Sequence, residues 1–354
     1  MTKGKEISKL EEKGISIIIC CYNSEKRLSP TLEHLSNVII PEEYQCELII
    51  VDNNSKDKTS STAKNLWSQF GNPFTIKILK ELNQGLIYAR QLGIKSSKFN
   101  FILFADDDNW LDRRYLVEAV GILEKHPKIG ILGGWGEGVF EVEPPVYFYG
   151  YYPFKSLHNN LAISKPGDNI GFLDNPEEII FGAGTFFRRQ VFIDLSRCGF
   201  KSLLTGRKGN QVISGEDAEL CFATKMLGYK LYRTDKLKFE HYIPEGRLSN
   251  EYLKKLFFGF GFTEPIQSIY TYLLKNRGEL ANISQSVLKI KLRIFLLALA
   301  VFMIKLSRFK KLEKVTLLLE MEKGKLKYLS ENQNDYKKSV ATITSFYEKA
   351  SLSK

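Results

Sequence analysis

Short apolar runs alternate with helical patterns through the first half of the chain. Five runs have the length of strands, and the segments between them show the spacing of apolar residues expected of helices. The expected strands are 15–20, 47–51, 75–79, 99–105 and 129–132. The expected helices are 28–39, 59–70, 85–96 and 114–125. This alternation predicts an α/β fold with a mostly parallel central sheet, and runs this apolar belong to strands covered on both faces.

The second half is less regular. Residues 133 to about 176 are rich in Gly, Pro and Tyr, which predicts a long insertion over one sheet edge. A helix is expected to open near Glu216, and a strand from Leu237 delivers His241. We divide the chain into an N-terminal arm (1–13), an α/β domain (14–250, with halves of about 14–133 and 134–250) and a helical region (251–354).

Composition and charge narrow the class of protein. With 354 residues, 44% of them hydrophobic, the chain can bury a large core and is not disordered. The net charge is +11, of which residues 287–354 carry +9 (15 basic, 6 acidic). A nucleic-acid reader would carry its positive charge on the folded domain, so we expect no nucleic-acid partner.

Cysteine usage and the N-terminus point to a cellular compartment. Five cysteines without a C-x-x-C spacing support neither a zinc site nor a disulfide framework. The first residues, MTKGKEISKLEEKG, contain no apolar signal-peptide core. We therefore expect a cytoplasmic protein, with a peripheral position at the inner face of the cell membrane as an alternative. The oligomeric state stays open.

That alternative comes from the basic segment 287–311. Its apolar run at 294–304 has 11 residues, about 16 Å as a helix against a hydrocarbon core of roughly 30 Å. Basic residues flank the run on both sides, as expected at an anionic interface. Three interpretations stay open, namely attachment to a membrane surface, a buried packing or dimer helix, and a tilted span.

Polar side chains follow three of the expected strands. Asn23 comes after the first, Asp52 after the second, and Asp106, Asp107 and Asp108 after the fourth. Ligands of open α/β sheets bind at this carboxyl edge. Adjacent carboxylates raise each other's pKa unless a cation compensates them, and Mg²⁺ or Mn²⁺ with oxygen ligands is the natural compensation. A solvated, helix-capping turn is the competing interpretation.

Such an ion typically keeps substrate phosphates in its shell, which fits a nucleoside diphosphate. The chain has neither G-x-x-x-x-G-K-[ST] nor a G-x-G-x-x-G after a strand, so it is not a P-loop or a dinucleotide-binding protein. Metal and scattered cations would have to hold the phosphates.

Five segments in order carry a resemblance. They are Cys-Tyr-Asn after the first strand, VDNNSKDKT (51–59), NQGLIYARQLGI (83–94), FADDDNW (104–110) and SGEDAEL (214–220). Together they resemble family 2 glycosyltransferases of the GT-A fold, over about residues 14 to 245. The resemblance implies a Rossmann-like, mostly parallel central sheet flanked by helices, here with a helical C-terminal extension.

The resemblance also implies roles for individual residues. The donor and nucleotide would contact the side chains or backbone of Asn23, Asp52, Arg90, Asp106, Asp107, Gly184 and Arg247. Asp108 and His241 would hold Mn²⁺ or Mg²⁺, with Asp107 pointing away from the ion. Asp217 of the Glu216-Asp217 pair would be the general base, a role that a carboxylate within reach of the acceptor hydroxyl can perform.

The expected function is inverting transfer of a sugar from a nucleotide diphosphate, with UDP as the expected nucleotide, to a glycan or lipid-linked acceptor in cell-surface polysaccharide synthesis. The second strand ends in Asp-Asn-Asn rather than Asp-Asp-Gly, which leaves base preference open. No Q-x-x-R-W follows the Glu-Asp helix, which favours single additions. A sugar nucleotidyltransferase and a catalytically silent membrane-associated scaffold are the alternatives.

Overall fold

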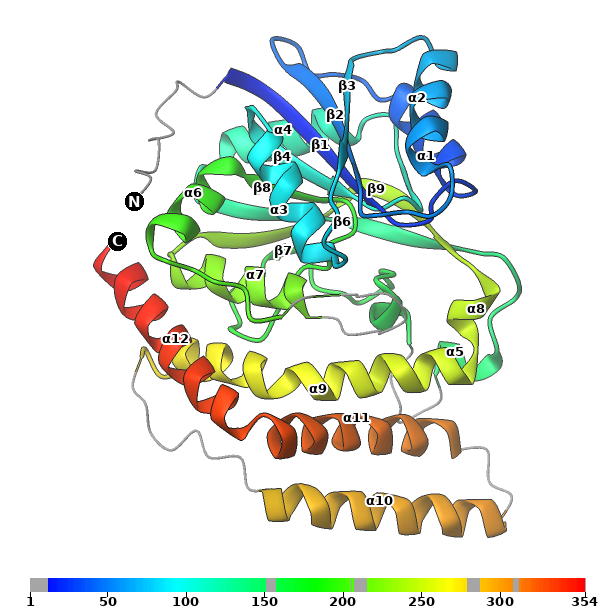
Figure 1. Ribbon diagram of the computed structural model, residues 1–354, viewed down its shortest axis with the longest axis vertical. Coiled ribbons are helices and arrows are strands. Elements are labelled where there is room, and N and C mark those ends of the chain that lie inside the picture. The colour runs from blue at the N-terminus through cyan, green and yellow to red at the C-terminus, as the bar shows by residue number, and fades with distance from the viewer. Residues whose placement is uncertain are drawn as a thin grey trace.

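The computed structural model describes residues 12–150, 157–204, 206, 215–278, 287–307 and 312–353. These residues form one sheet with helices on both faces and a stack of long helices at one end (Figure 1). The strands are β1 (Glu12–Cys21), β2 (Gln45–Asp52), β3 (Thr75–Lys80), β4 (Phe99–Ala105), β5 (Asn109–Leu111), β6 (Ile129–Phe140), β7 (Gly171–Phe172), β8 (Thr185–Arg188) and β9 (Lys230–Ile243).

The strand order is β3-β2-β1-β4-β8-β6-β9-β5, with β7 paired to β9. The four strands at the β3 end run parallel, as the alternation of strand and helix predicts. β8 runs antiparallel to β4 and β6, and β5 runs antiparallel to β9. The carboxyl ends of β1, β2 and β4 therefore lie at one edge, where the polar endings of these strands meet.

The helices of the α/β part are α1 (Leu28–Ser36), α2 (Thr59–Gln69), α3 (Leu86–Ser96), α4 (Tyr115–Lys125), α5 (Val146–Tyr149), α6 (Arg189–Arg197), α7 (Glu216–Met226) and α8 (Glu245–Leu248). A short 3₁₀ helix spans His158–Leu161. Ile17 and Ile19 of β1 face the core shared with α1, α2 and α4. Ile18 faces the opposite core, shared with α3, α6 and α7. A strand covered on both faces needs no polar alternation, which explains the unbroken apolar run.

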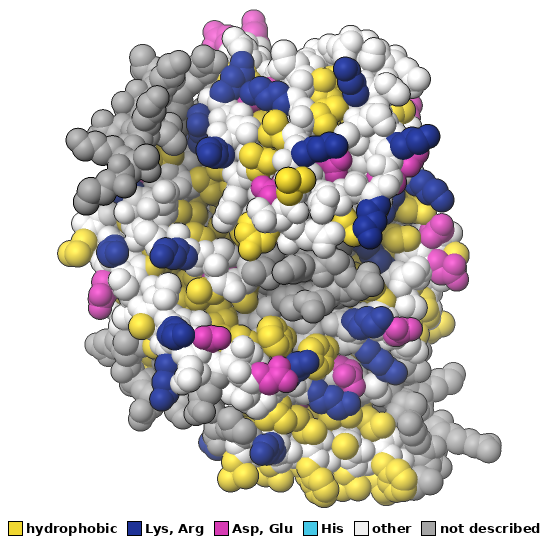
Figure 2. All heavy atoms as spheres, viewed as in Figure 1, with side chains coloured by type: hydrophobic (Ala, Val, Ile, Leu, Met, Phe, Trp, Pro, Cys, Tyr) yellow, Lys and Arg dark blue, Asp and Glu magenta, His cyan; other side chains and the backbone are white. Residues whose placement is uncertain are grey.

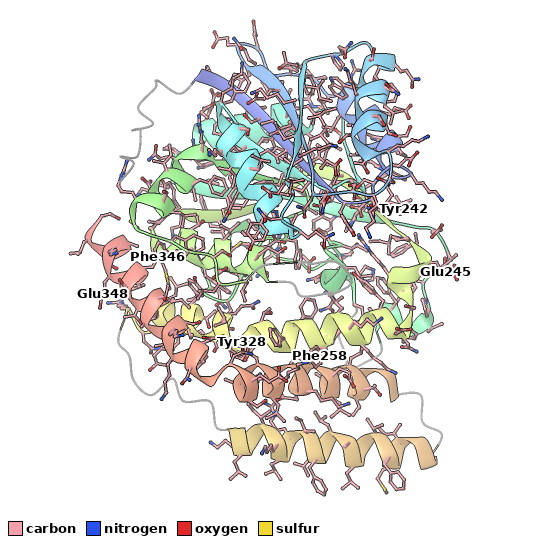
Figure 3. The ribbon with its side chains drawn as sticks, in the orientation of Figure 1. Tyr242, Glu245, Phe258, Tyr328, Phe346 and Glu348 are labelled. Atoms are coloured by element: carbon pink, nitrogen blue, oxygen red, sulfur yellow. The ribbon has the colours of Figure 1, made fainter. Side chains whose placement is uncertain are left out.

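The C-terminal region consists of α9 (Asn250–Lys275), α10 (Val287–Ser307), α11 (Leu312–Glu331) and α12 (Gln333–Leu352). α9 packs on α7, α11 packs on α9, and α10 lies outermost against α11 (Figure 1). Tyr328 of α11 and Phe346 of α12 are labelled in Figure 3. Tyr328 meets Phe262 of α9 edge to face at 5.2 Å between ring centroids, and Phe346 meets Phe200 in the same way. Within the described chain, every helix falls short of the length and apolar character needed to cross a bilayer.

The expectation of an irregular insertion from residue 133 was wrong for its first part. β6 continues to Phe140, pairing with β9 from Gly133 to the strand's end. A Cβ at Gly133 would collide with Ile180, and one at Gly136 would collide with Phe239, so these glycines mark close packing rather than a loop. β9 also begins earlier than predicted, at Lys230 rather than Leu237. Its pairing with β6 shifts register between Gly133 and Trp135 of β6.

Candidate active site

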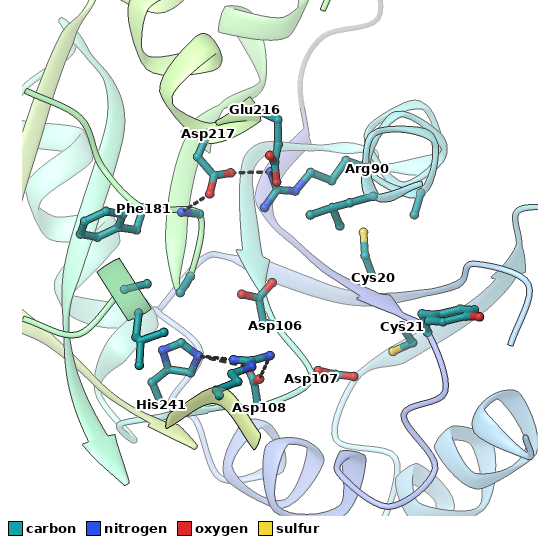
Figure 4. A pocket seen from close by; sticks show the side chains of 18 of the residues that line it. Cys20, Cys21, Arg90, Asp106, Asp107, Asp108, Phe181, Glu216, Asp217 and His241 are labelled. Atoms are coloured by element: carbon teal, nitrogen blue, oxygen red, sulfur yellow. Dashed lines mark hydrogen bonds and ion pairs between the residues drawn. The ribbon is translucent and has the colours of Figure 1, made fainter. Parts of the chain in front are cut away.

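The three aspartates at the end of β4 point in different directions (Figure 4). Asp106 lines a cavity in the centre of the site. Asp107 accepts a hydrogen bond from Ser24 and pairs with Arg27 at 2.7 Å, so it fixes the loop after β1. Asp108 turns toward β9 and is almost fully buried. The carboxylates of Asp107 and Asp108 thus have different partners. Asp107 points away from Asp108, as predicted from the sequence.

Asp108 meets His241 and Arg247 at one side of the cavity. The pairing of β5 with β9 places Asn109 opposite His241, which brings the imidazole beside the preceding aspartate. His241 Nε2 lies 3.5 Å from Asp108 Oδ1, and the guanidinium of Arg247 lies 3.0 Å from Asp108 Oδ2. Arg247 Nη1 is also 3.4 Å from His241 Nε2. The predicted metal-binding pair is thus adjacent, with a protein cation beside it.

Asp217 lies on the other side of the cavity, at the first turn of α7. The helix begins after Gly215, whose φ of 127° is a conformation that glycine adopts without strain. Asp217 Oδ2 accepts a hydrogen bond from the backbone N–H of Gly182 at 2.9 Å, and Arg90 of α3 donates to its Oδ1. The carboxylate of Glu216 is buried 3.8 Å from the same guanidinium.

Several charged side chains lie close together in this site, and burial and neighbouring charges shift their pKa values. Burial raises the pKa of Asp106, and the neighbouring Asp108 raises it further. For Arg90, burial alone lowers the pKa, but Asp217 and Glu216 raise it above its usual value. The pKa of Arg247 is also raised, because the charge of Asp108 outweighs the lowering effect of burial. The site therefore alternates acids with permanently charged arginines. Burial raises the pKa of the Cys20 thiol to about 12, so it is no nucleophile at neutral pH.

The loops after β1 and β2 form the end of the cavity nearest those strands. Asn23 lines it with a φ of 51°, and its amide oxygen accepts from the backbone of Lys56. The carboxylate of Asp52 accepts from Ser55 and Ser60 and lies behind Asn53. Asn53 reaches the cavity, accepting from the Gly85 N–H at the start of α3 at 2.8 Å.

Together these elements enclose a cavity of about 540 Å³, a size typical of sites for nucleotide-sized ligands. Nine of the predicted site residues line it, namely Asn23, Arg90, Asp106, Asp107, Asp108, Glu216, Asp217, His241 and Arg247. Two do not. Asp52 makes the turn contacts described above, and the carbonyl of Gly184 accepts a hydrogen bond from the Tyr115 hydroxyl.

Sequence reasoning missed several contributions to the lining, among them an arginine and one face of a helix. Arg27, in the polar stretch after β1, brings a third arginine to the cavity and was not singled out. Tyr252, Leu256 and Phe260 of α9 also line it, so the C-terminal region beyond residue 250 shares in the site. Their four-residue spacing, which places them on one helix face, was the available signal.

The residues present can accommodate a divalent cation. Among the described residues no group of three or more His, Cys, Asp or Glu side chains is placed to hold a metal ion. Mg²⁺ and Mn²⁺, however, need only one or two protein ligands when substrate phosphates and water complete the shell. Asp108 and His241 supply a carboxylate and an imidazole, and Nδ1 of the buried His241 has no hydrogen-bond partner in the described structure.

Comparison with known proteins agrees with this geometry. The model for glycosyl transferase family 2 matches residues 16–195, from β1 to α6. The chain belongs to glycosyltransferase family 2. The GT-A fold class expected from the sequence is confirmed, with the central sheet flanked by helices and the helical C-terminal extension.

Bacterial relatives of this family member include the following proteins. The minor teichoic acid biosynthesis protein GgaA of Bacillus subtilis is 30% identical over 181 residues, 50% of this chain and 37% of the relative. The poly-β-1,6-N-acetyl-D-glucosamine synthase of Staphylococcus aureus is 27% identical over 134 residues, 38% of this chain and 31% of the relative. The chain thus spans about a third of these relatives' length. S. aureus TarS 1–349 with UDP has a TM-score of 0.46 at 16% identity, covering 91% of this chain and 92% of that one.

Proposed function

We propose that this protein is an inverting glycosyltransferase that moves a sugar from a nucleoside diphosphate donor, UDP-linked, to a glycan or lipid-linked acceptor in cell-surface polysaccharide or teichoic acid synthesis. The observation that carries the proposal is the convergence of Asp106, Asp108 and Asp217 on one cavity. Arg90 pairs there with Asp217, and Arg247 with Asp108. Acids and arginines so interleaved suit a ligand that carries both hydroxyls and phosphates.

In this proposal Asp217 is the general base. The acceptor oxygen attacks the anomeric carbon, the bond from that carbon to the phosphate oxygen breaks, and the acceptor proton passes to the Asp217 carboxylate. The Gly182 N–H and Arg90 orient this carboxylate. Attack opposite the leaving group inverts the anomeric configuration, as in single-displacement glycosidases.

Arginines and a cation would stabilise the leaving diphosphate. Arg90 and Arg247 line the cavity and stay charged at all physiological pH values. Asp108 and His241 would hold Mn²⁺ or Mg²⁺, which, when bound, neutralises charge developing on the departing phosphate oxygen. Asp106 would contact the ribose or the donor sugar, and Asn23 with Asn53 would contact the nucleoside.

The relatives support the proposed pathway, and the cysteines support the proposed compartment. GgaA is named for minor teichoic acid biosynthesis and the Staphylococcus synthase for a poly-N-acetylglucosamine, although the chain spans only about a third of each. All five cysteines are free thiols, which suits the reducing cytoplasm. We propose that the reaction takes place there, on acceptors presented at the membrane.

The test is a thermal-shift panel of UDP-, GDP-, dTDP- and CMP-sugars with and without Mn²⁺. A donor at about a hundred times its Kd should stabilise the protein by about 2.7 kcal/mol. UDP-sugars should raise the Tm only with the metal, and Asp108→Asn should abolish this gain. Asp174→Asn, which alters an exposed acid paired with Lys230, is the matched control and should retain it.

Failure would also be clear. If no nucleotide sugar shifted the Tm, the donor assignment would be wrong and the silent-scaffold alternative would be favoured. If the shift were equal with EDTA and in Asp108→Asn, the metal assignment would fail and the transferase proposal would have to stand without it.

A further inference from the structure

The outer face of α10 exposes a continuous apolar stripe. Figure 2 shows a patch of hydrophobic side chains over this helix at one end of the molecule. Each side chain of the stripe is between 48% and 77% exposed, whereas an ordinary surface helix shows polar residues outward. The α10 stripe consists of Leu288, Leu292, Phe295, Leu296, Leu299, Phe302 and Met303.

Helix geometry shows that α10 is apolar on two opposite faces. At about 100° per residue, the α10 stripe covers an arc of about 120°. The face about 180° away consists of Ile290, Ile294, Leu297, Val301 and Ile304, none of which is classed as exposed. Ile290 is 5% exposed and belongs to the hydrophobic core that also contains Ile18 of β1. Ile294 packs against that core. The inward face is satisfied by α11, so the stripe is not needed to hold the helix in place.

Two exposed lysines of α10 border the stripe. The helix contains Lys289, Lys291, Arg293 and Lys305 and no acidic residue. Lys289 and Lys291 are exposed and project about 80° to either side of the stripe's centre line. Arg293 pairs with the buried Glu322 of α11 at 3.1 Å. In the sequence, Arg308, Lys310 and Lys311 follow the helix.

We infer that the α10 stripe is a membrane-binding face that lies in the interface of an anionic bilayer. Helices of this kind bury their apolar face about 5–10 Å deep while flanking cations meet anionic headgroups. A second copy of the chain fits less well. Because both ends of α10 are basic, pairing two such helices in either direction brings like charges together.

A membrane-spanning arrangement does not suit this helix either. One face of α10 packs against the protein, and the uncharged run at 294–304 covers only about half of a hydrocarbon core. The helix therefore lies along the surface rather than across it.

The position of α10 links the membrane to the cavity. Tyr252, Leu256 and Phe260 of α9 line the cavity, α11 packs on α9, and α10 packs on α11. At 8–10 Å per helix pair, the α10 axis lies on the order of 20 Å from that of α9. A lipid-linked acceptor could thus reach the site from the bound surface, a consequence that rests on the proposed function, whereas membrane binding itself does not.

The test is flotation of the full chain with vesicles, without donor or acceptor. Wild-type protein should float with vesicles of phosphatidylcholine and phosphatidylglycerol (70:30) and less with phosphatidylcholine alone. Phe295→Gln/Phe302→Gln should abolish flotation. Lys289→Gln/Lys291→Gln should lower the partition coefficient by about thirtyfold, the equivalent of about 1 kcal/mol per lysine.

The matched control is Leu82→Gln/Ile170→Gln, which removes two exposed apolar side chains elsewhere and should float like wild type. Equal Tm values would show that all variants fold. The inference is overturned if wild type stays unbound on anionic vesicles or if the phenylalanine variant floats normally. A third outcome would also overturn it, namely that neither protein binds vesicles but wild type forms a dimer that the phenylalanine variant does not. The α10 stripe would then contact a second copy of the chain rather than a membrane.

Discussion

Arg90 and Asp217 form an ion pair in the wall of the cavity, with 2.5 Å between guanidinium Nη1 and carboxylate Oδ1. The two residues are 127 positions apart and come from α3 and α7, so the pair ties α3 to the start of the helix that carries the proposed base.

Replacing the positively charged Arg90 should destabilise the protein. We expect Arg90→Met to lower the free energy of unfolding by about 3 kcal/mol, because the buried Glu216 and the neighbouring Asp217 lose their counter-ion. Arg197→Met is the control, since Arg197 is 69% exposed and pairs within its own helix. It should change stability by less than about 0.5 kcal/mol in urea unfolding. Equal stability of the two variants would contradict this view of Arg90.

Asp217→Asn should separate binding from chemistry. The amide can still accept from Gly182, so donor affinity should be retained, whereas the transfer rate should fall by about 10²- to 10⁴-fold. Titration calorimetry and product formation would measure the two quantities. Transfer at the wild-type rate would remove Asp217 as the base.

Arg247 should compete with a divalent cation for Asp108. The guanidinium occupies one oxygen of that carboxylate, and a hydrogen bond between charged groups contributes about 1.5–3 kcal/mol. We therefore expect Arg247→Met to bind Mn²⁺ about tenfold more tightly than wild type in the absence of nucleotide. The signal of free Mn²⁺ in electron paramagnetic resonance measures this, with the exposed Arg114→Met as control. Weaker or unchanged binding would show that the two do not compete.

Asp106 should make stability depend on pH. Because burial and Asp108 raise its folded-state pKa, the folded protein holds this proton more tightly than the unfolded chain does. Its contribution to stability therefore declines as the pH rises from about 3.8 through the folded pKa, and the full penalty remains above that value. Asp106→Asn should raise the Tm at pH 7, and the gain should shrink toward pH 4. A gain independent of pH would contradict this explanation.

Packing of α9 against α11 should depend on glycine. A Cβ at Gly261 would collide with the backbone of Met321, as would one at Gly324 with the backbone of Phe258. Gly261→Ala should therefore lower the free energy of unfolding by about 1–3 kcal/mol. Gly121 of α4 faces open space, so Gly121→Ala should instead raise it by about 0.5–1 kcal/mol. Urea unfolding of both variants tests the contrast.

Local pattern was sufficient for much of the fold. The run from Ile15 to Cys20 could be identified as a covered strand because its apolar character is a property of neighbouring residues. The glycine-rich part of β6 could not, because its pairing with β9 joins residues about a hundred positions apart. Glycine in a strand and glycine in a loop look alike until the packed neighbours are known.

The sequence by itself determined that the polar residues after β1, β2 and β4 lie at one edge of the sheet, since the carboxyl ends of parallel strands meet there. Only the tertiary structure decided which of them face each other. Asp108 lies beside His241 because β5 pairs with β9, and Asp217 lies beside Arg90 because α7 and α3 flank the same face. The same holds for α10, whose run at 294–304 is apolar all round in the sequence. Only packing on α11 shows which face remains exposed, because burial depends on contacts between distant segments.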